Sequence, residues 1–182
     1  GGATTHTEIS GVTDYKMKDD QECLATIRDL IGKLGPRKTA GFNRTEPKLP
    51  SKSSAEIFEI LPESRTSPYD MNELLECIID KDSFTEFKKG YGQTIITGYA
   101  RIDGWSVGIV ANQRKMSRTE LGEMQVGGVI YSDSADKGAR FIMNCNQDKI
   151  PIIFIHDVNG FMIGKHSEWS GIAKDGAKLV NA

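Results

Sequence analysis

The chain has 182 residues, which is enough for one hydrophobic core of ordinary size. Its 23 basic and 25 acidic residues leave a net charge of −2, so there is no positive excess with which to bind nucleic acid or an anionic membrane surface. The charged fraction is 26%, and no apolar run approaches the roughly 20 residues of a membrane-spanning helix, which excludes such a helix.

The cysteines are odd in number and far apart, and Cys23, Cys77 and Cys145 each fall in a pattern typical of a buried helix face. We therefore expect reduced thiols in a reducing compartment. The opening stretch GGATTHTEISGVTD has neither the charged and apolar regions of a signal peptide nor the arginine-rich character of a transit peptide. It also lacks an initiator methionine, so we expect a piece of a longer protein.

An amphipathic helix is predicted from Asp19 to Leu34, with Asp19 and Glu22 as a capping pair. Its apolar residues recur at three- and four-residue spacing, at Leu24, Ile27, Ile31 and Leu34. From Pro36 to Pro68 the chain holds five of its six prolines, which predicts an extended linker between two structural units. The one apolar island in it, residues 57–61, can form a short docked helix.

A second helix should begin at Asp70, which stands three residues before Glu73 like another capping pair, and should end near Asp80. The β-rich runs TIITGYARI and WSVGIVANQ follow. Between them lies Asp103-Gly104, a dipeptide that allows the two positive φ angles of a two-residue hairpin turn. This pattern predicts a β-hairpin. Residues 114–126 show no clean period and are interpreted as a loop or a short helix.

After a short apolar run at Val129 to Tyr131, Ser134 is predicted to cap a further helix. The apolar face of that helix holds Ala135, Ala139, Ile142 and Cys145. The run IPIIFIH that follows is apolar at both alternating positions, as expected of a parallel strand that is buried on both faces. A hairpin, a helix and a buried strand in this order predict an α/β fold.

The turn after this strand, Asp157 to Gly164, is the candidate site. In α/β folds ligands bind at the carboxyl ends of parallel strands, where backbone amides point into the crevice. Gly160 and Gly164 bracket Phe161, Met162 and Ile163, so the backbone can approach a ligand while three apolar side chains form a wall. Such a turn suits the binding of a carbonyl oxygen by N–H donors. The alternative is that the glycines only make a tight turn.

Other site types fit the sequence less well. GFMIGKH is one residue too short between its glycines for a phosphate loop, and it has a histidine where such a loop needs Ser or Thr. His156 and His166 flank the turn but lack the further ligands of a metal site, so structural roles are the simpler hypothesis. Lys174 and Lys178 can meet a phosphate or form a solvated face, and Asp157 can act as a base or as a cap.

Four blocks, in order along the chain, carry a resemblance to a known family. They include GGATTHTEISGVTD with DDQECLATIRDLI, then YDMNELLECIID with FTEFKKGYGQTIITGYARIDGWSVGIVAN, and the terminal DKGARFIMNCNQDKIPIIFIHDVNGFMIGKHSEWSGIAKDGAKLVNA. The sequence closely resembles the carboxyltransferase subunit of biotin-dependent acyl-CoA carboxylases, especially the propionyl-CoA and methylcrotonoyl-CoA types. The match leaves out only the linker and residues 114–126.

The resemblance implies a crotonase-like fold, an α/β superhelix of β-β-α units in two related domains. By the resemblance, residues 1–35 are the tail of the first carboxyltransferase domain, residues 36–69 are a linker, and residues 70–182 are the first part of an incomplete second domain. It also implies that the glycine loops that hold the acyl-CoA and the biotin fall outside this chain. The crevice residues that remain are then Gly160, Phe161, Met162, Ile163 and Gly164, with no catalytic side chain.

The implied reaction moves a carboxyl group from carboxybiotin to the α-carbon of a short-chain acyl-CoA. Biotin is then carried on a partner, acyl-CoA is the substrate, and this chain holds no metal. The implied partners are the biotin carboxyl carrier and biotin carboxylase subunits, in a homo-oligomer located in the cytoplasm, or in the mitochondrial matrix of a eukaryote. Two alternatives stay open: a biotin-dependent decarboxylase or transcarboxylase of the same fold, and an inactive structural fragment of the carboxylase.

Overall fold

The computed structural model describes residues 2–4, 7–8, 14–34, 43–64, 66–119 and 121–182. The chain divides into two compact units, residues 1–39 and residues 40–182. No helix in the described ranges is both long enough and apolar enough to cross a membrane.

The first unit contains one main helix, α1 (Asp20–Leu34). The predicted capping pair is confirmed, because the Asp19 carboxylate accepts a hydrogen bond from the Glu22 amide at 2.8 Å. The apolar face of α1 remains open within its unit, since Leu24, Ile27 and Ile31 are each about half exposed. The prediction that Cys23 is buried is wrong, because its side chain is exposed on this helix.

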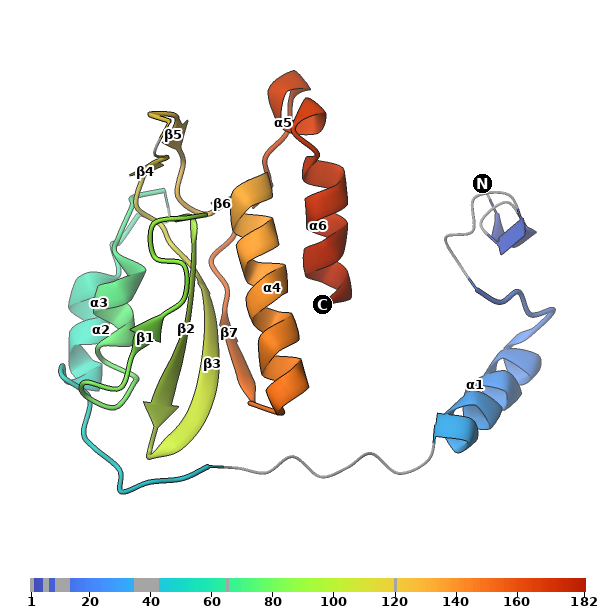
Figure 1. The fold of residues 1–182 in the computed structure, drawn as a ribbon, viewed down its shortest axis with the longest axis horizontal. Helices are drawn as coiled ribbons and strands as arrows, with labels where there is room; N and C mark the ends of the chain where they lie inside the picture. Colours follow the sequence, from blue (N-terminus) through green and yellow to red (C-terminus); the bar gives the residue numbers. More distant parts are fainter. Residues whose placement is uncertain (1, 5–6, 9–13, 35–42, 65, 120) are drawn as a thin grey trace. The chain divides into compact units, whose positions relative to one another are not determined.

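The second unit is built on a four-stranded sheet with helices on both faces (Figure 1). The strand order is β1-β2-β3-β7; β2 pairs antiparallel with both β1 and β3, and β7 runs parallel to β3. The sheet strands are β1 (Thr85–Glu86), β2 (Ile95–Ile102), β3 (Trp105–Asn112) and β7 (Ile152–Ile155). The helices are η2 (Ser54–Glu56), α2 (Ile57–Ile60), α3 (Met71–Leu75), α4 (Ser132–Asp148), α5 (Lys165–Trp169) and α6 (Ile172–Asn181).

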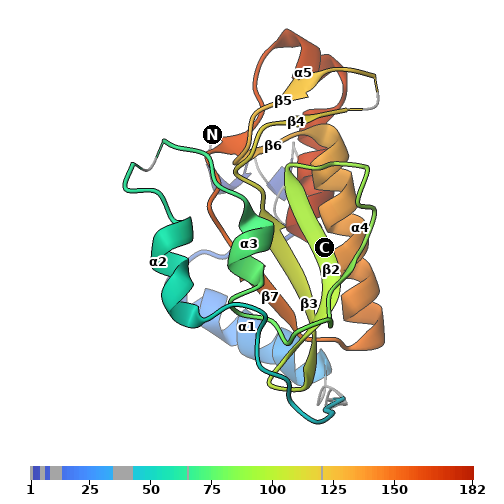
Figure 2. The same ribbon diagram turned by 90° about the vertical axis from the view of Figure 1, so that its left-hand side faces the viewer.

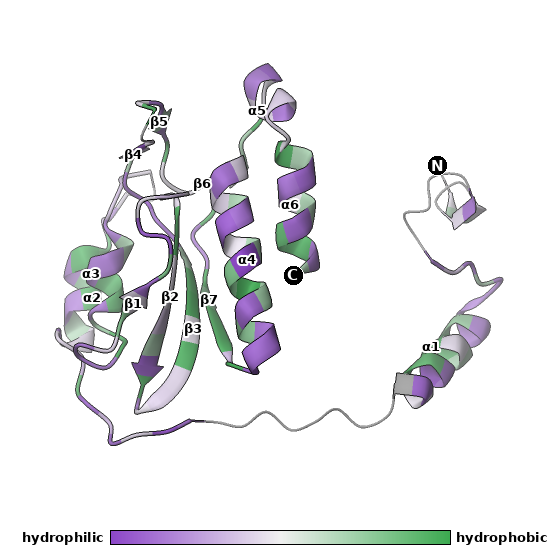
Figure 3. Cartoon of the chain, viewed as in Figure 1, coloured by the Kyte–Doolittle hydropathy of each residue, from purple (hydrophilic) through white to green (hydrophobic). Residues whose placement is uncertain are grey.

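The two faces of the sheet bury two separate apolar clusters. Alternate residues of β2 and β3, such as Ile96 and Ile109, pack against α3 and the turn after it, which Figure 2 shows in front of the sheet. The residues between them, such as Ile95 and Val110, pack against Phe141 of α4 on the opposite face. Figure 3 shows these apolar stretches in green along the strands. The period of two in the sequence thus places α2 and α3 on one face and α4 on the other.

The predicted hairpin is confirmed. Strands β2 and β3 pair in antiparallel register from Ile95 and Asn112 to Ile102 and Trp105. Asp103 and Gly104 have φ angles of 49° and 78°, as a type I′ turn requires. The buried carboxylate of Asp80 accepts hydrogen bonds from both turn amides at 2.8 Å. The turn is therefore held from outside as well as by its own conformation.

Residues 43–61 belong to the second unit. Thr45 donates its amide hydrogen to the Gly104 carbonyl at 3.0 Å, and Lys52 donates to the Glu76 carbonyl at 3.0 Å. The apolar island forms η2 and α2, and Ile57 and Ile60 pack against the core, so the docked helix is confirmed. This part of the predicted linker, residues 36–69, therefore packs on the sheet unit.

Three further elements differ from the sequence prediction. Helix α3 is capped by Asp70 as expected but ends at Leu75, because a tight turn brings Asp80 to the hairpin. Helix α4 begins at Ser132, and its N-cap is Tyr131 instead of the predicted Ser134. The Ser134 hydroxyl accepts a hydrogen bond from the Tyr131 amide.

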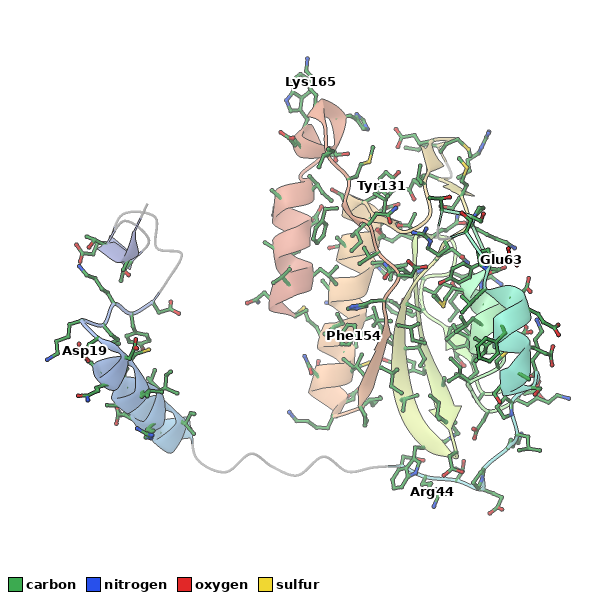
Figure 4. All side chains as sticks on the ribbon, turned by 180° about the vertical axis from the view of Figure 1, so that it is seen from behind. Asp19, Arg44, Glu63, Tyr131, Phe154 and Lys165 are labelled. Atoms are coloured by element: carbon green, nitrogen blue, oxygen red, sulfur yellow. The ribbon has the colours of Figure 1, made fainter. Side chains whose placement is uncertain are left out.

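Strand β7 is parallel as predicted, but the prediction that both its faces are buried is wrong. It is the edge strand of the sheet, and Phe154, labelled in Figure 4, is 49% exposed.

Residues 114–126 form neither a simple loop nor a helix. They contain a small hairpin of β4 (Ser117–Arg118) and β5 (Met124–Gln125), with Gly122 at a φ of 87° near its tip. A second pair, β6 (Val129–Ile130) and β8 (Gly160–Phe161), runs parallel and joins this region to the turn after β7. The two small sheets are built on the carboxyl side of the main sheet's strands β3 and β7.

Candidate active site

The turn from Asp157 to Gly164 leaves the carboxyl end of β7, as predicted. Its first half is tied to β6, because the Asn159 amide donates to the Gly128 carbonyl at 2.7 Å and the Met162 amide donates to the Ile130 carbonyl at 2.8 Å. Gly160 has a φ of 138° and Gly164 a φ of 110°, a range that favours glycine. Both glycines are therefore required by the backbone of the turn.

The second half of the turn carries free donors. In the part of the chain that the structure describes, no group accepts a hydrogen bond from the backbone amides of Ile163 and Gly164. These two amides are consecutive and lie just before α5. Two backbone amides can bind a carbonyl oxygen or an oxyanion when both point at the same position.

The three apolar side chains of the turn have different surroundings. The Phe161 ring lies against Gly176 of α6, where an added Cβ would come within 3.0 Å of the ring. Met162 and Ile163 instead face a cavity and remain 36% and 80% exposed. The expected apolar wall is thus formed by Met162 and Ile163, whereas Phe161 anchors the turn to a helix.

The cavity has a volume of about 710 Å³, within the usual range of small-molecule sites. The β4–β5 hairpin faces the turn across it, so Leu121 and Met124 stand opposite Met162 and Ile163. Figure 4 labels Tyr131 and Lys165, which lie at the starts of α4 and α5 on its border. The lining residues are Gly90, Tyr91, Gly92, Gln93, Thr119, Leu121, Glu123, Met124, Gln125, Tyr131, Ser132, Asp133, Met162, Ile163, Gly164, Lys165, His166, Ser167 and Ser170.

A polar network surrounds the first half of the turn. The Arg114 guanidinium forms an ion pair with Asp157, with 3.3 Å between Nε and Oδ2, and donates a hydrogen bond to Asn159 Oδ1 at 3.3 Å. Tyr69 donates its hydroxyl hydrogen to Asp157 at 2.8 Å. Burial and this carboxylate raise the pKa of Tyr69 to about 12, so the phenol stays protonated near neutral pH. Asp157 thus accepts a hydrogen bond from Tyr69 and forms an ion pair with Arg114, so it is not a free base.

Next to this network, Asp70 has a second role besides capping α3. Its carboxylate accepts hydrogen bonds from Lys115 and Gln113, each at 2.8 Å. Partial burial raises the pKa of Asp70, but these hydrogen bonds outweigh that effect and lower the pKa to about 2. The residues after β3 are therefore linked both to the start of α3 and to the turn.

Two of the remaining candidates from the sequence lie outside the cavity lining: His156 packs edge-on against Phe154, and Lys178 pairs with Asp136 and Asp175. His166 lines the cavity and is exposed, with Glu123 at 3.7 Å. No group of three or more potential metal ligands occurs in the described ranges. The chemistry that the site can offer is therefore hydrogen bonding by backbone amides beside an apolar cavity.

The second unit is thus an α/β fold that has two unpartnered backbone amides in the turn after a parallel strand. The chain belongs to the carboxyl transferase domain family, whose model matches residues 1–182. It is 40% identical to the biotin-dependent 3-methylcrotonyl-coenzyme A carboxylase beta1 subunit of Mycobacterium tuberculosis, over 100% of this chain and 32% of that protein. It is also 40% identical to the mitochondrial methylcrotonoyl-CoA carboxylase beta chain of Dictyostelium discoideum, over 100% of this chain and 29% of that one.

Among solved structures, the transcarboxylase 12S hexamer with methylmalonyl-coenzyme A and methylmalonic acid bound matches with a TM-score of 0.65 and 30% identity, over 100% of this chain and 34% of that one. The predicted family and the crotonase-like α/β fold are confirmed by these matches. The chain spans about a third of the length of these relatives.

Sequence reasoning missed two parts of this region. Arg114 and the β4–β5 hairpin lie in the segment without a clean period, where strands of two residues leave too little alternation to detect. The signal that could have located them is the glycine pair Gly127-Gly128, which ends the segment next to a short β-rich run.

Proposed function

We propose that this chain is part of a carboxyltransferase that moves a carboxyl group from carboxybiotin to the α-carbon of an acyl-CoA, with residues 160–164 in the substrate and biotin crevice. The observation that carries the proposal is the pair of free amides at Ile163 and Gly164 on the border of an apolar cavity, in a chain of this family. In the same proposal, residues 1–35 are the tail of the first carboxyltransferase domain, residues 36–69 are a linker, and residues 70–182 are the first part of the second domain.

The chemistry of the reaction matches what the turn offers. When the carboxyl group leaves biotin, negative charge develops on the urea oxygen and the urea nitrogen becomes basic enough to take the proton of the thioester α-carbon. Loss of that proton places negative charge on the thioester oxygen, and the enolate carbon takes the carboxyl group. Either oxygen is stabilised by converging N–H donors, each worth roughly 3 to 4 kcal/mol of transition-state stabilisation. Ile163 and Gly164 can supply two donors without any titrating side chain.

The cavity fits an apolar group of the size of a short acyl chain or of the fused ring system of biotin. Leu121, Met124, Met162 and Ile163 line it with apolar side chains, which would keep water away from the reacting atoms. Biotin, bound to a carrier, would supply the carboxyl group. The residues of this chain would bind and orient the reacting groups and would exclude water from them.

A biotin-dependent transcarboxylase or decarboxylase is the second candidate, since the solved neighbour named above is a transcarboxylase. The partners proposed are a biotin carboxyl carrier and a biotin carboxylase subunit, and the proposed assembly is a homo-oligomer like the transcarboxylase 12S hexamer. The proposed location is the cytoplasm, or the mitochondrial matrix of a eukaryote; the Dictyostelium relative is mitochondrial. Assays with carboxybiotin and with a carboxylated acyl-CoA as donor separate the candidates by the direction of transfer.

We expect Gly160→Val in the full-length subunit to reduce carboxyl transfer at least 100-fold while the protein stays folded. No atom lies within 4 Å of a Cβ at this position, so the cost comes from the φ of 138°, which a β-branched residue strains by roughly 1 to 3 kcal/mol. The turn relieves this strain by moving the amides that follow. The measurement is the rate of formation of carboxylated acyl-CoA from a carboxylated biotin carrier.

Gly171→Val is the matched control, because Gly171 also has a positive φ, 97°, and an open Cβ position but lies between α5 and α6. It should lose stability and keep most of its activity. Near-normal turnover of Gly160→Val would show that the turn is not part of the active site.

A further inference from the structure

We propose that Arg114 is a positioning residue, which holds the Asp157–Gly164 turn against the base of the β4–β5 hairpin and so fixes both walls of the cavity. This inference rests on the proposed function, because it assigns Arg114 to the same turn. It also gives a role to residues 114–126, for which the sequence offered none.

The first observation is that the guanidinium is buried against the turn. The Arg114 side chain is only 8% exposed. It reaches Asp157 with Nε and Asn159 with Nη1, both at 3.3 Å, so it binds the chain on either side of Val158 and immediately before Gly160. A planar guanidinium can make these two contacts at once, whereas an ammonium group is a single point of charge.

The second observation is that the base of the hairpin closes around the same residue. Gly128 donates its amide hydrogen to the Gln113 carbonyl at 2.8 Å, which joins the two ends of the segment. A Cβ on Gly127 would overlap with the Arg114 carbonyl, and a Cβ on Gly128 would overlap with the Arg114 guanidinium. The chain thus passes Arg114 at a distance that only glycine allows.

The third observation is that a backbone hydrogen bond joins the turn directly to the base of the hairpin. The Gly128 carbonyl accepts the Asn159 amide at 2.7 Å, so the turn, the hairpin base and the guanidinium form one closed group. Beyond this group the hairpin carries Leu121 and Met124 to one wall of the cavity, and the turn carries Met162 and Ile163 to the other. A shift at Arg114 is therefore transmitted to both walls and to the free amides.

The distinguishing property of a positioning residue is its effect on turnover. In the full-length subunit, Arg114→Met should lower kcat for carboxyl transfer by tenfold to 100-fold and change KM for the acyl-CoA by less than about threefold. The reason is that a displacement of about 1 Å of groups that act in the transition state costs up to about 100-fold in rate. Arg114→Lys keeps the positive charge but not the planar guanidinium, so its kcat should lie between those of Arg114→Met and the parent protein.

The matched control is Arg118→Met. Arg118 lies on β4 of the same hairpin, is exposed, and contacts Met124 instead of the turn. It should leave kcat unchanged. If kcat per folded molecule is also unchanged in Arg114→Met and Arg114→Lys, then Arg114 only stabilises the fold and the inference is wrong.

A second measurement separates this inference from the proposed function. Amide hydrogen exchange of the peptide that covers residues 158–164 should be at least tenfold faster in Arg114→Met than in Arg118→Met, with the β2–β3 hairpin unchanged in both. This result supports the positioning role even if the parent subunit transfers no carboxyl group. Equal exchange in the two variants would overturn it whatever the activity assay gives.

Discussion

Replacing Gly104 by alanine should lower the free energy of unfolding by about 3 kcal/mol. Gly104 has a φ of 78°, where a side chain costs about 1 to 2 kcal/mol, and the added Cβ would overlap with the Thr45 carbonyl oxygen, which adds about 1 to 3 kcal/mol. The overlap also pushes apart the hydrogen bond from the Thr45 amide to the Gly104 carbonyl. The measurement is urea denaturation followed by circular dichroism.

Gly90→Ala is the control for this change. An added Cβ at Gly90 meets no atom within 4 Å, and its φ lies outside the positive range. It should change the free energy of unfolding by less than about 1 kcal/mol. If Gly104→Ala behaves like Gly90→Ala, the close approach of residues 43–45 to the hairpin turn does not occur in solution.

Replacing Lys137 by methionine should raise the free energy of unfolding at pH 7 by about 2 kcal/mol. The Lys137 side chain on α4 is fully buried, and its Nζ has no hydrogen-bond partner in the part of the chain that the structure describes. Burial lowers the pKa of Lys137 to about 8, although Glu86 and Asp133 nearby partly oppose this shift. An apolar side chain of similar length avoids the cost of burying the charge, which is typically 1 to 4 kcal/mol.

The pH dependence provides an independent measurement. Between about pH 8 and pH 10.5 the unfolded state binds more protons at Lys137 than the folded state does, so the stability of the parent chain should rise with pH through this range. Below about pH 8 both states are protonated and the full cost remains. Lys137→Met should remove this rise, whereas Lys174→Met, at an exposed position of α6, should keep it. A rise of equal size in both variants would contradict the assignment.

The parts of the fold that sequence predicts well are those determined by neighbours in the chain. Asp103 and Gly104 fix a two-residue turn, and the strands on either side follow from alternation alone. Asp70 caps α3 because its carboxylate needs only the amide of Asn72, two residues on. The glycines at 160 and 164 likewise predicted the candidate turn, because positive φ angles are a local requirement.

The parts that sequence does not predict depend on contacts between distant residues. Helix α3 ends before Asp80, because the Asp80 carboxylate accepts hydrogen bonds from the amides of Asp103 and Gly104. The prolines of residues 43–61 predict a linker, but backbone amides in this segment donate hydrogen bonds to the carbonyls of residues 76 and 104. Such distant partners leave no local pattern. In the site, Arg114 has no local pattern, since its partners Asp157 and Asn159 lie more than 40 positions away in the sequence.

The parallel pairing of β7 with β3 has a consequence for the order of folding. Strand β2 meets β3 across a two-residue turn, whereas Gly108 meets Ile152 only after the chain has closed a loop that contains all of α4. Closing a long loop costs conformational entropy before the contacts of β7 with β3 can form. Strand β7 should therefore pair after the β2–β3 hairpin has formed and should detach before that hairpin opens. The turn that begins at Asp157 is attached to this strand. The candidate site thus sits on an edge strand that should detach before the β2–β3 hairpin does, so a substrate could enter without unfolding the core.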